Sequence, residues 1–302
     1  METMNFNLEL TDEQKKYREE CISFCMNNSH VLNFLFDNDL DINFVKDHSS
    51  KLKEWALNKQ VCANCKGLAE CKFNEGRYFE LKMDDTFLTQ VYSKCRYFRE
   101  KEEKNEYLKN YVLYHGNDDM KCRDFTMVDK TNKDSAAVID VCNTLIKSFS
   151  SNKGIYLCGK PGIGKTFFMN CLGNYYVKKG IKVAFVNSPT LLSDLKNNFG
   201  VSGYSEDILN KLKKCEILIL DDIGGESISA WSRDEVFMPL LNERMEKGLK
   251  TYFTSNYDFK ELEEHFSIDS RGNVDKIKAN RLMERIKAVS YEKTLKGINR
   301  RI

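Results

Sequence analysis

Residues 159–166 read "GKPGIGKT", which fits the phosphate-binding pattern G-x-x-x-x-G-K-[ST]. An apolar run, "GIYLCG" (154–159), leads into this stretch, and a helical pattern, "FFMNCLGNYYVKK" (167–179), follows it. Glycines at this spacing let the backbone curl until successive N–H groups face a phosphate, and the following helix adds its positive end. The stretch therefore predicts a strand, a phosphate-binding loop and a helix, which together begin an α/β nucleotide-binding fold.

Two side chains of this loop are expected to contact ATP directly. We expect Lys165 to reach the β- and γ-phosphates and the Thr166 hydroxyl to hold Mg²⁺. An accidental glycine-rich turn is the alternative, and a matching acidic strand downstream argues against it. The predicted nucleotide-binding residues of the loop are Gly159, Pro161, Gly162, Ile163, Gly164, Lys165, Thr166 and Phe167.

The acidic strand reads "ILILDDIGG" (217–225). Its apolar residues predict a buried strand that delivers Asp221 and Asp222 to its carboxyl end, where the ligands of open α/β sheets bind. We expect Asp221 to be the carboxylate on the magnesium side and Asp222 to orient the attacking water. Asp222 is one methylene shorter than the glutamate common at this point in such ATPases, so hydrolysis is expected to be slow. An acidic turn after a core strand is the alternative.

Three more apolar runs complete the predicted sheet. They read "KVAFVN" (182–187), "KTYFTSN" (250–256) and "AVSYEK" (288–293), with stretches long enough for helices between them. Runs of this kind are typical of parallel strands buried on both faces, so we expect a central parallel sheet flanked by helices. The amide of Asn256 is expected to sense the γ-phosphate, although Ser-Asn-Tyr-Asp is also good turn chemistry.

The amino-terminal part of the chain differs in character. Apolar residues recur at helical spacing over 12–60, and a cysteine-bearing segment spans 61–98. A charged run and a polar "HGNDD" follow, which we interpret as a connecting helix and a linker. The predicted domains are a small helical zinc-binding domain (1–98), the connecting helix and linker (99–117) and the ATPase domain (118–302).

Length and charge narrow the functional classes. The chain of 302 residues has room for roughly two domains. Its net charge of +2 gives no global signature of nucleic-acid binding, so any DNA contact must be local, and the basic residues over 276–301 are the candidates. The amino terminus lacks a signal-peptide pattern, and no apolar run is long enough to span a membrane. We therefore expect a cytoplasmic protein with no membrane partner, whose 11 cysteines stay reduced.

Four cysteines have the spacing of a metal site. Cys62 and Cys65 form a C-x₂-C pair, Cys71 follows, and Cys95 lies after a longer interval. Two thiolates at such close spacing can share one tetrahedral ion, and two more would close a structural Zn²⁺ site. Ordinary reduced cysteines in a small core are the alternative.

Four further segments are more specific than the phosphate-binding motif. They read "LILDDIGGESISAWSRDEVF" (218–237), "TYFTSNYDFKELEEHF" (251–266), "DSRGNVDKIKANRLMERI" (269–286) and "GINRR" (297–301). Together they resemble the bacterial replicative-helicase loaders of the DnaI type, relatives of DnaC, over most of 118–302 and more faintly over the cysteine segment. The resemblance implies an AAA+ P-loop NTPase in which the strand ending in Asn256 lies between the strands of the phosphate loop and Asp221.

The resemblance also implies a function. Loaders of this type bind a hexameric replicative DNA helicase and deliver it onto single-stranded DNA when replication initiates or restarts, with other primosome proteins as further partners. ATP hydrolysis would be weak and would depend on assembly or on DNA. The 1–98 domain would contact the helicase, and the ATPase domain would oligomerise on it.

Three arginines receive roles from the resemblance. Arg271 matches the finger that completes the nucleotide site of a neighbouring subunit. Arg281 and Arg285 are four residues apart and hence on one helix face, from which one of them can reach the nucleotide of its own subunit. Arg285 is the first choice for this sensor and Arg281 the second. Solvated helix charge is the alternative for both.

The cysteine segment departs from the family in one respect. The resemblance supports zinc, but the family's ligand set includes a histidine, and this sequence has none between His48 and His115. Cys71 is the expected substitute.

A second function remains open. ATP-dependent DNA-targeting regulators of the transposition-helper type share the same core, but they usually lack an amino-terminal cysteine module, which favours the loader. A small-molecule kinase would use the same phosphate loop, but no substrate lid is evident, and the paired arginines fit an oligomeric switch better.

Overall fold

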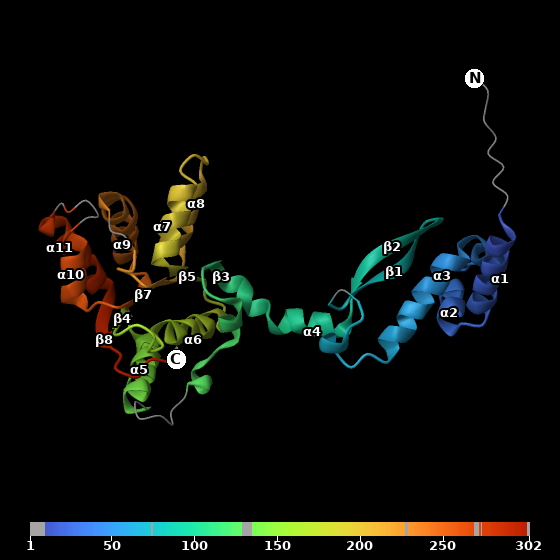
Figure 1. Ribbon diagram of the computed structural model, residues 1–302, viewed down its shortest axis with the longest axis horizontal. Coiled ribbons are helices and arrows are strands. Elements are labelled where there is room, and N and C mark those ends of the chain that lie inside the picture. Colours follow the sequence, from blue (N-terminus) through green and yellow to red (C-terminus); the bar gives the residue numbers. More distant parts are fainter. Residues whose placement is uncertain are drawn as a thin grey trace, which may run out of the picture. The chain divides into compact units, whose positions relative to one another are not determined.

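The computed structural model describes residues 10–73, 75–128, 135–226, 229–268, 272 and 274–300. The chain divides into two compact units, Met1–Asn105 and Glu106–Ile302 (Figure 1). The division falls between the predicted domain boundaries at 98 and 118. Within the described ranges, no helix combines the length and the apolar character that crossing a membrane requires.

The first unit contains helices and one β-hairpin. Its elements are α1 (Asp12–Met26), α2 (Ser29–Asp37), α3 (Ile42–Ala63), a 3₁₀ turn (Leu68–Glu70), β1 (Arg77–Asp84), β2 (Phe87–Lys94) and α4 (Arg96–Lys104). Thr11 begins α1 with a capping box, and Asp41 caps α3 by accepting two backbone N–H bonds. Buried Trp55 donates to Glu80 of the hairpin at 3.0 Å, which ties α3 to β1. The helices predicted over 12–60 are present, whereas the hairpin within the cysteine segment was not predicted.

A parallel six-stranded sheet forms the centre of the second unit. Its strands are β3 (Tyr111–Tyr114), β4 (Gly154–Cys158), β5 (Val183–Asn187), β6 (Ile217–Asp221), β7 (Lys250–Ser255) and β8 (Ser290–Thr294). They lie in the order β3-β5-β6-β7-β4-β8, and each pair of neighbours is parallel. The implied position of the sensor strand is confirmed, because β7 lies between β4 and β6.

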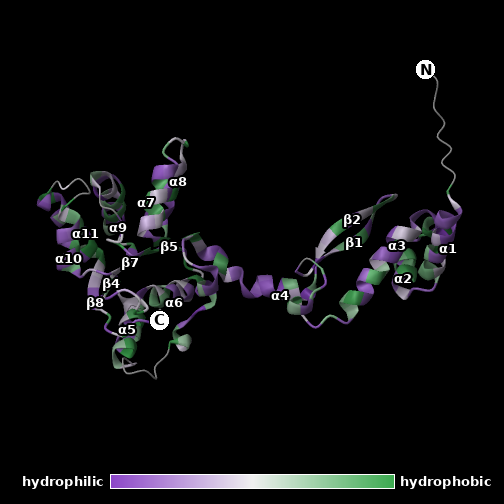
Figure 2. Ribbon diagram, viewed as in Figure 1, coloured by the Kyte–Doolittle hydropathy of each residue, from purple (hydrophilic) through white to green (hydrophobic). Residues whose placement is uncertain are grey.

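Helices cover both faces of this sheet. They are α5 (Ser135–Lys147), α6 (Lys165–Lys178), α7 (Ser188–Asn197), α8 (Tyr204–Lys214), a π-helical stretch (Ser232–Phe237), α9 (Met238–Glu246), α10 (Phe259–Ser267) and α11 (Lys276–Val289), with 3₁₀ turns at Glu106–Asn110, Asp118–Cys122, Phe125–Met127 and Ser148–Ser150. Alternate strand residues enter different cores: Ile219 packs with α5 and α6, whereas Leu220 packs with α7 to α11. Figure 2 shows β5 in mostly hydrophobic colours and α4 in hydrophilic ones. This is the three-layer arrangement predicted for buried parallel strands.

The structure corrects the interpretation of residues 99–117 as a connecting helix and linker. The helix α4 ends at Lys104, and the "YVLY" at 111–114 is the edge strand β3, in which Tyr114 pairs with Phe185 of β5. The four apolar residues are half-buried at the sheet edge, which a solvated linker would not provide. Residues from 106 onward therefore belong to the ATPase unit.

Candidate nucleotide-binding site

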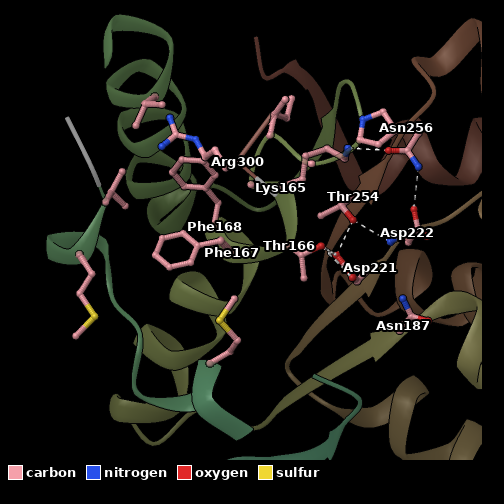
Figure 3. A pocket seen from close by; sticks show the side chains of 18 residues that line it. Lys165, Thr166, Phe167, Phe168, Asn187, Asp221, Asp222, Thr254, Asn256 and Arg300 are labelled. Carbon is pink, nitrogen blue, oxygen red and sulfur yellow. Dashed lines mark hydrogen bonds between the residues drawn. The ribbon is translucent and has the colours of Figure 1, made fainter. Parts of the chain in front are cut away.

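The carboxyl ends of β4, β6 and β7 meet at one edge of the sheet, where the phosphate-binding loop lies (Figure 3). The loop joins β4 to α6 as the sequence predicts. Gly159, Gly162 and Gly164 have φ values of +148°, +80° and +103°, which glycine adopts without steric cost. The loop thus has the curled backbone that the spacing of its glycines indicates.

Lys165 is at the centre of a chain of hydrogen bonds. The residue is only 7% exposed, and its ammonium donates to the carbonyls of Gly159 at 2.7 Å and Lys160 at 2.9 Å. It also donates to Oδ1 of Asn256 at 2.8 Å, and the amide of Asn256 donates to Asp222 at 3.2 Å. The predicted lysine, sensor amide and water-orienting carboxylate therefore come together, from the start of α6 and from the turns that follow β7 and β6 (Figure 3).

Asp221 lies next to Thr166, the other predicted magnesium-side residue. The Thr166 hydroxyl donates to Oδ1 of Asp221 at 2.9 Å, and the Thr254 hydroxyl donates to the same oxygen at 2.7 Å. Burial raises the pKa of Asp221 above its usual value, while the bonds from Thr254 and Thr166 oppose that rise. A hydroxyl and a carboxylate side by side are the oxygen ligands that Mg²⁺ prefers, so these residues fit that ion.

The backbone turns sharply after β6. Asp222 has a φ of +57°, a left-handed conformation that is uncommon outside glycine. Its N–H donates to the Thr254 hydroxyl at 2.8 Å, which holds the turn from β7. The turn directs the Asp222 carboxylate toward Asn256 rather than along the strand.

A cavity of about 710 Å³ adjoins the loop, a volume ordinary for a nucleotide pocket. Its polar side carries the residues already described, and its other side is apolar and suited to a base. Sequence reasoning missed part of the lining, which includes Met120, Met127, Val128, Val138, Phe168, Asn187, Thr254 and Arg300. Thr254 resembles any β-branched strand residue in the sequence, and the apolar lining residues resemble core.

Of the three arginines with implied roles, Arg281 and Arg285 belong to the described helix α11. Arg271 is outside the described residues. Arg285 of α11 is half-buried and its Nε donates to the Asn242 side chain of α9, while Arg281 is exposed. Neither Arg281 nor Arg285 is among the described residues that line the cavity.

The four predicted zinc ligands gather in one region of the first unit. Burial raises the pKa of the Cys62 thiol, and negative charge on Cys65, Cys71 and Cys95 raises it further. Three of the thiols bond to nearby backbone instead of to a common point: Cys65 donates to Gly67, Cys71 accepts from Gly76, and Cys95 accepts from Phe98. Among the described residues, no three histidine, cysteine or acidic side chains are arranged to hold a metal ion. The geometry therefore does not support zinc.

Comparison with known proteins identifies relatives of the whole chain. The family model of the IstB-like ATP binding protein matches residues 84–293. The chain is 31% identical over 296 residues to the replicative helicase loader DnaI of Bacillus subtilis (strain 168), which covers 96% of this chain and 94% of that protein. It is 29% identical over 118 residues to the replicative helicase loader DnaC of Buchnera aphidicola subsp. Baizongia pistaciae, 38% of this chain and 48% of the relative.

Solved structures agree with these relatives. The crystal structure of a DnaI is 30% identical, covers 61% of this chain and 96% of its own, and has a TM-score of 0.52. The structure described as "a putative primosome component from Streptococcus pyogenes serotype M3" is 28% identical, covers 66% of this chain and 100% of its own, and also has a TM-score of 0.52. The chain therefore belongs to the replicative helicase loaders of the DnaI type, within the family of IstB-like ATP binding proteins.

Proposed function

We propose that this chain is an ATP-controlled loader that binds a replicative DNA helicase and delivers it onto single-stranded DNA. The observation that carries the proposal is the connected site at the sheet edge, where Asn256 bonds to both Lys165 and Asp222. Similarity to a helicase loader along 96% of the chain supports the choice of partner and favours the loader over a transposition-helper regulator.

The residues of the site suit the hydrolysis of ATP to ADP and phosphate. Lys165 would bind the β- and γ-phosphates, and the N–H groups of the loop would surround them. Thr166 and Asp221 would hold Mg²⁺, which when bound neutralises charge on the phosphates. Asp222 would orient the attacking water. Asn256 would connect the γ-phosphate to both Lys165 and Asp222, because it bonds to each of them.

The arginine roles are proposals of the same kind. Arg271 would stabilise charge on the γ-phosphate of a neighbouring subunit, which requires that the ATPase units assemble, in this proposal on the helicase. Arg285, or Arg281, would contact the nucleotide of its own subunit. The bond from Arg285 to Asn242 would then have to exchange for one to phosphate.

Zinc binding in the first unit also remains a proposal. The C-x₂-C spacing and the gathering of the four cysteines in one region of the first unit support it, whereas the observed arrangement of the thiols does not. Metal analysis of reduced, purified protein tests it. Less than roughly half an equivalent of zinc would argue against a stable site.

The function is tested with the helicase itself. We expect the immobilised full chain and the fragment of residues 1–105 both to retain the host's replicative helicase. Delivery of that helicase onto circular single-stranded DNA, measured by strand displacement, is expected to need the full chain with ATP and to fail with Lys165→Ala. If neither the full chain nor the fragment retains the helicase, the regulator becomes the better description.

A further inference from the structure

The segment that follows β8 crosses the phosphate-binding loop. We call residues 295–300 the strap. Leu295 is 2% exposed and its N–H donates to the carbonyl of Cys158, the last residue of β4, at 2.8 Å. Five residues later, the N–H of Arg300 donates to the carbonyl of Gly162 at 2.9 Å. The strap is thus attached to the end of β4 at its beginning and to the phosphate-binding loop at its end.

Close packing accompanies these two bonds. A Cβ at Gly159 would lie 2.4 Å from the carbonyl oxygen of Leu295, and one at Gly162 would lie 2.1 Å from Oδ1 of Asn299. Both separations are far below van der Waals contact. Glycine is therefore required at both positions for two reasons: it leaves room for the strap, and it adopts the positive φ of the loop.

The strap brings a positive side chain to the cavity. Among the described residues that line the cavity, Lys165 and Arg300 are the cationic ones, and Asp221 and Asp222 are the acidic ones. The Cδ of Arg300 is 3.8 Å from where a Cβ on Gly164 would be. Figure 3 shows Arg300 beside Phe168, on the opposite side of the loop from Asn256.

This placement indicates which part of a nucleotide Arg300 can reach. Lys165 and Asn256 mark the γ-phosphate end of the proposed site, and the apolar lining, which includes Phe168 and Val138, marks the base end. Arg300 lies toward the base end, where the α-phosphate and ribose of a bound nucleotide would be. A guanidinium is well suited to a phosphate because it offers paired donors in a fixed plane.

We propose that Arg300 binds the α-phosphate and ribose end of the nucleotide held by its own subunit, with the strap fixing its position against the loop. The inference rests on the proposed ATP site. It assigns Arg300 to nucleotide binding rather than to the DNA-facing charge in which sequence reasoning included it. Because ATP and ADP share this end, the contact contributes equally to both, unlike a contact that senses the γ-phosphate.

The test is a pair of titrations of the full chain with fluorescent ATP and ADP in the presence of magnesium. We expect Arg300→Ala to weaken the binding of ATP and of ADP by the same factor, about tenfold, and Arg300→Lys to weaken the binding of both by less. Lys296→Ala is the matched control, since it removes one positive charge from an exposed position of the same strap, and it should bind both nucleotides like the wild type.

The outcomes separate this inference from the proposed function. If the wild type shows no saturable binding of ATP, the proposed function fails. If the wild type binds ATP, two results would overturn the assignment of Arg300 while leaving the ATP site in place. Arg300→Ala could bind both nucleotides as well as the wild type does, or it could lose affinity for ATP while keeping its affinity for ADP. Thermal unfolding without nucleotide checks that the variant folds. Should Arg300→Ala unfold, Arg300→Lys carries the test, and its equality with the wild type for both nucleotides would overturn the assignment.

Discussion

The phosphate-binding loop and the cysteine segment both carry closely spaced functional side chains, but only the first is assembled into a connected network. Lys165, Asn256 and Asp222 follow three neighbouring strands, so the register of the sheet sets their separations. The cysteines come from the last turn of α3, a loop and the start of α4, and the thiols of Cys65, Cys71 and Cys95 bond to local backbone. Residues placed by a sheet are positioned by folding alone, whereas thiols on loops need the metal itself to draw them together.

The largest expected effect concerns the network itself. Lys165→Ala should weaken ATP binding about 100-fold, close to 3 kcal/mol, because it removes a buried charged donor to phosphate. Lys160→Ala is the matched control, since Lys160 belongs to the same loop, is exposed and has a side chain outside the cavity lining among the described residues. Calorimetric titration measures both. Equal loss in the two variants would mean that general loop charge, not the network, binds ATP.

The second prediction concerns Glu226, four residues beyond Asp222. Its Oε2 accepts from the N–H of Gly224 at 3.0 Å, and its Oε1 has no partner among the described residues. Burial raises its pKa from 4.5 to about 7. The unfolded chain therefore ionises before the folded one, and stability falls as the pH rises from about 4.5 to 7 and then stays constant.

Glu226→Gln removes this pH-dependent loss. Below pH 4.5 the difference in unfolding free energy between the variant and the wild type should be constant. By pH 8 this difference should have shifted by about 3 kcal/mol in favour of the variant. Urea unfolding followed through Trp231 at several pH values measures the gain. A difference independent of pH would show that the carboxylate is not buried as described.

Comparing alanine variants of two glycines with nearly the same φ distinguishes the effect of backbone strain from the effect of the strap. Gly162 has a φ of +80° and Gly180 one of +81°, but a Cβ at Gly180 would meet nothing within 4 Å. Alanine at either position should cost about 1 kcal/mol of stability through its left-handed φ. Only Gly162→Ala should also weaken ATP binding, because Asn299 must move. If Gly180→Ala weakened ATP binding as much as Gly162→Ala does, the loss of binding would reflect general destabilisation of the protein.

The smallest expected effect tests the local bonding of the thiols. Cys95 caps α4 by accepting the N–H of Phe98 at 3.4 Å. With a chelator present, Cys95→Ser should leave the stability of the first unit unchanged, because serine is a good cap, and Cys95→Ala should lower it by about 1 kcal/mol. Fluorescence of Trp55 in a Trp231→Phe background reports that unit alone. An equal loss of stability in Cys95→Ser and Cys95→Ala would mean that the thiol itself, and not its capping bond, stabilises the first unit.

The same contrast explains what could be predicted from the sequence. The loop, Asp221 and Asn256 were predictable because strand ends and glycine spacing are local patterns with one physical meaning. Arg300 was not, because its place depends on β8 lying beside β4, a long-range pairing. The direction of Arg285 depends on how α11 packs on α9, which helical spacing does not reveal. Strand β3 was missed because four apolar residues after a charged run carry no turn signal.

One consequence follows from the central position of β7. Thr254 bonds to Asp221, the carboxylate proposed to hold Mg²⁺, and Asn256, two residues further along, bonds to Lys165, the lysine proposed to bind phosphate. Both bonds depend on the same short length of backbone, so displacing it would release both together. We therefore expect the proposed catalytic residues to respond as one unit, so that a partner displacing β7 would disrupt the Asp221 and Lys165 bonds together.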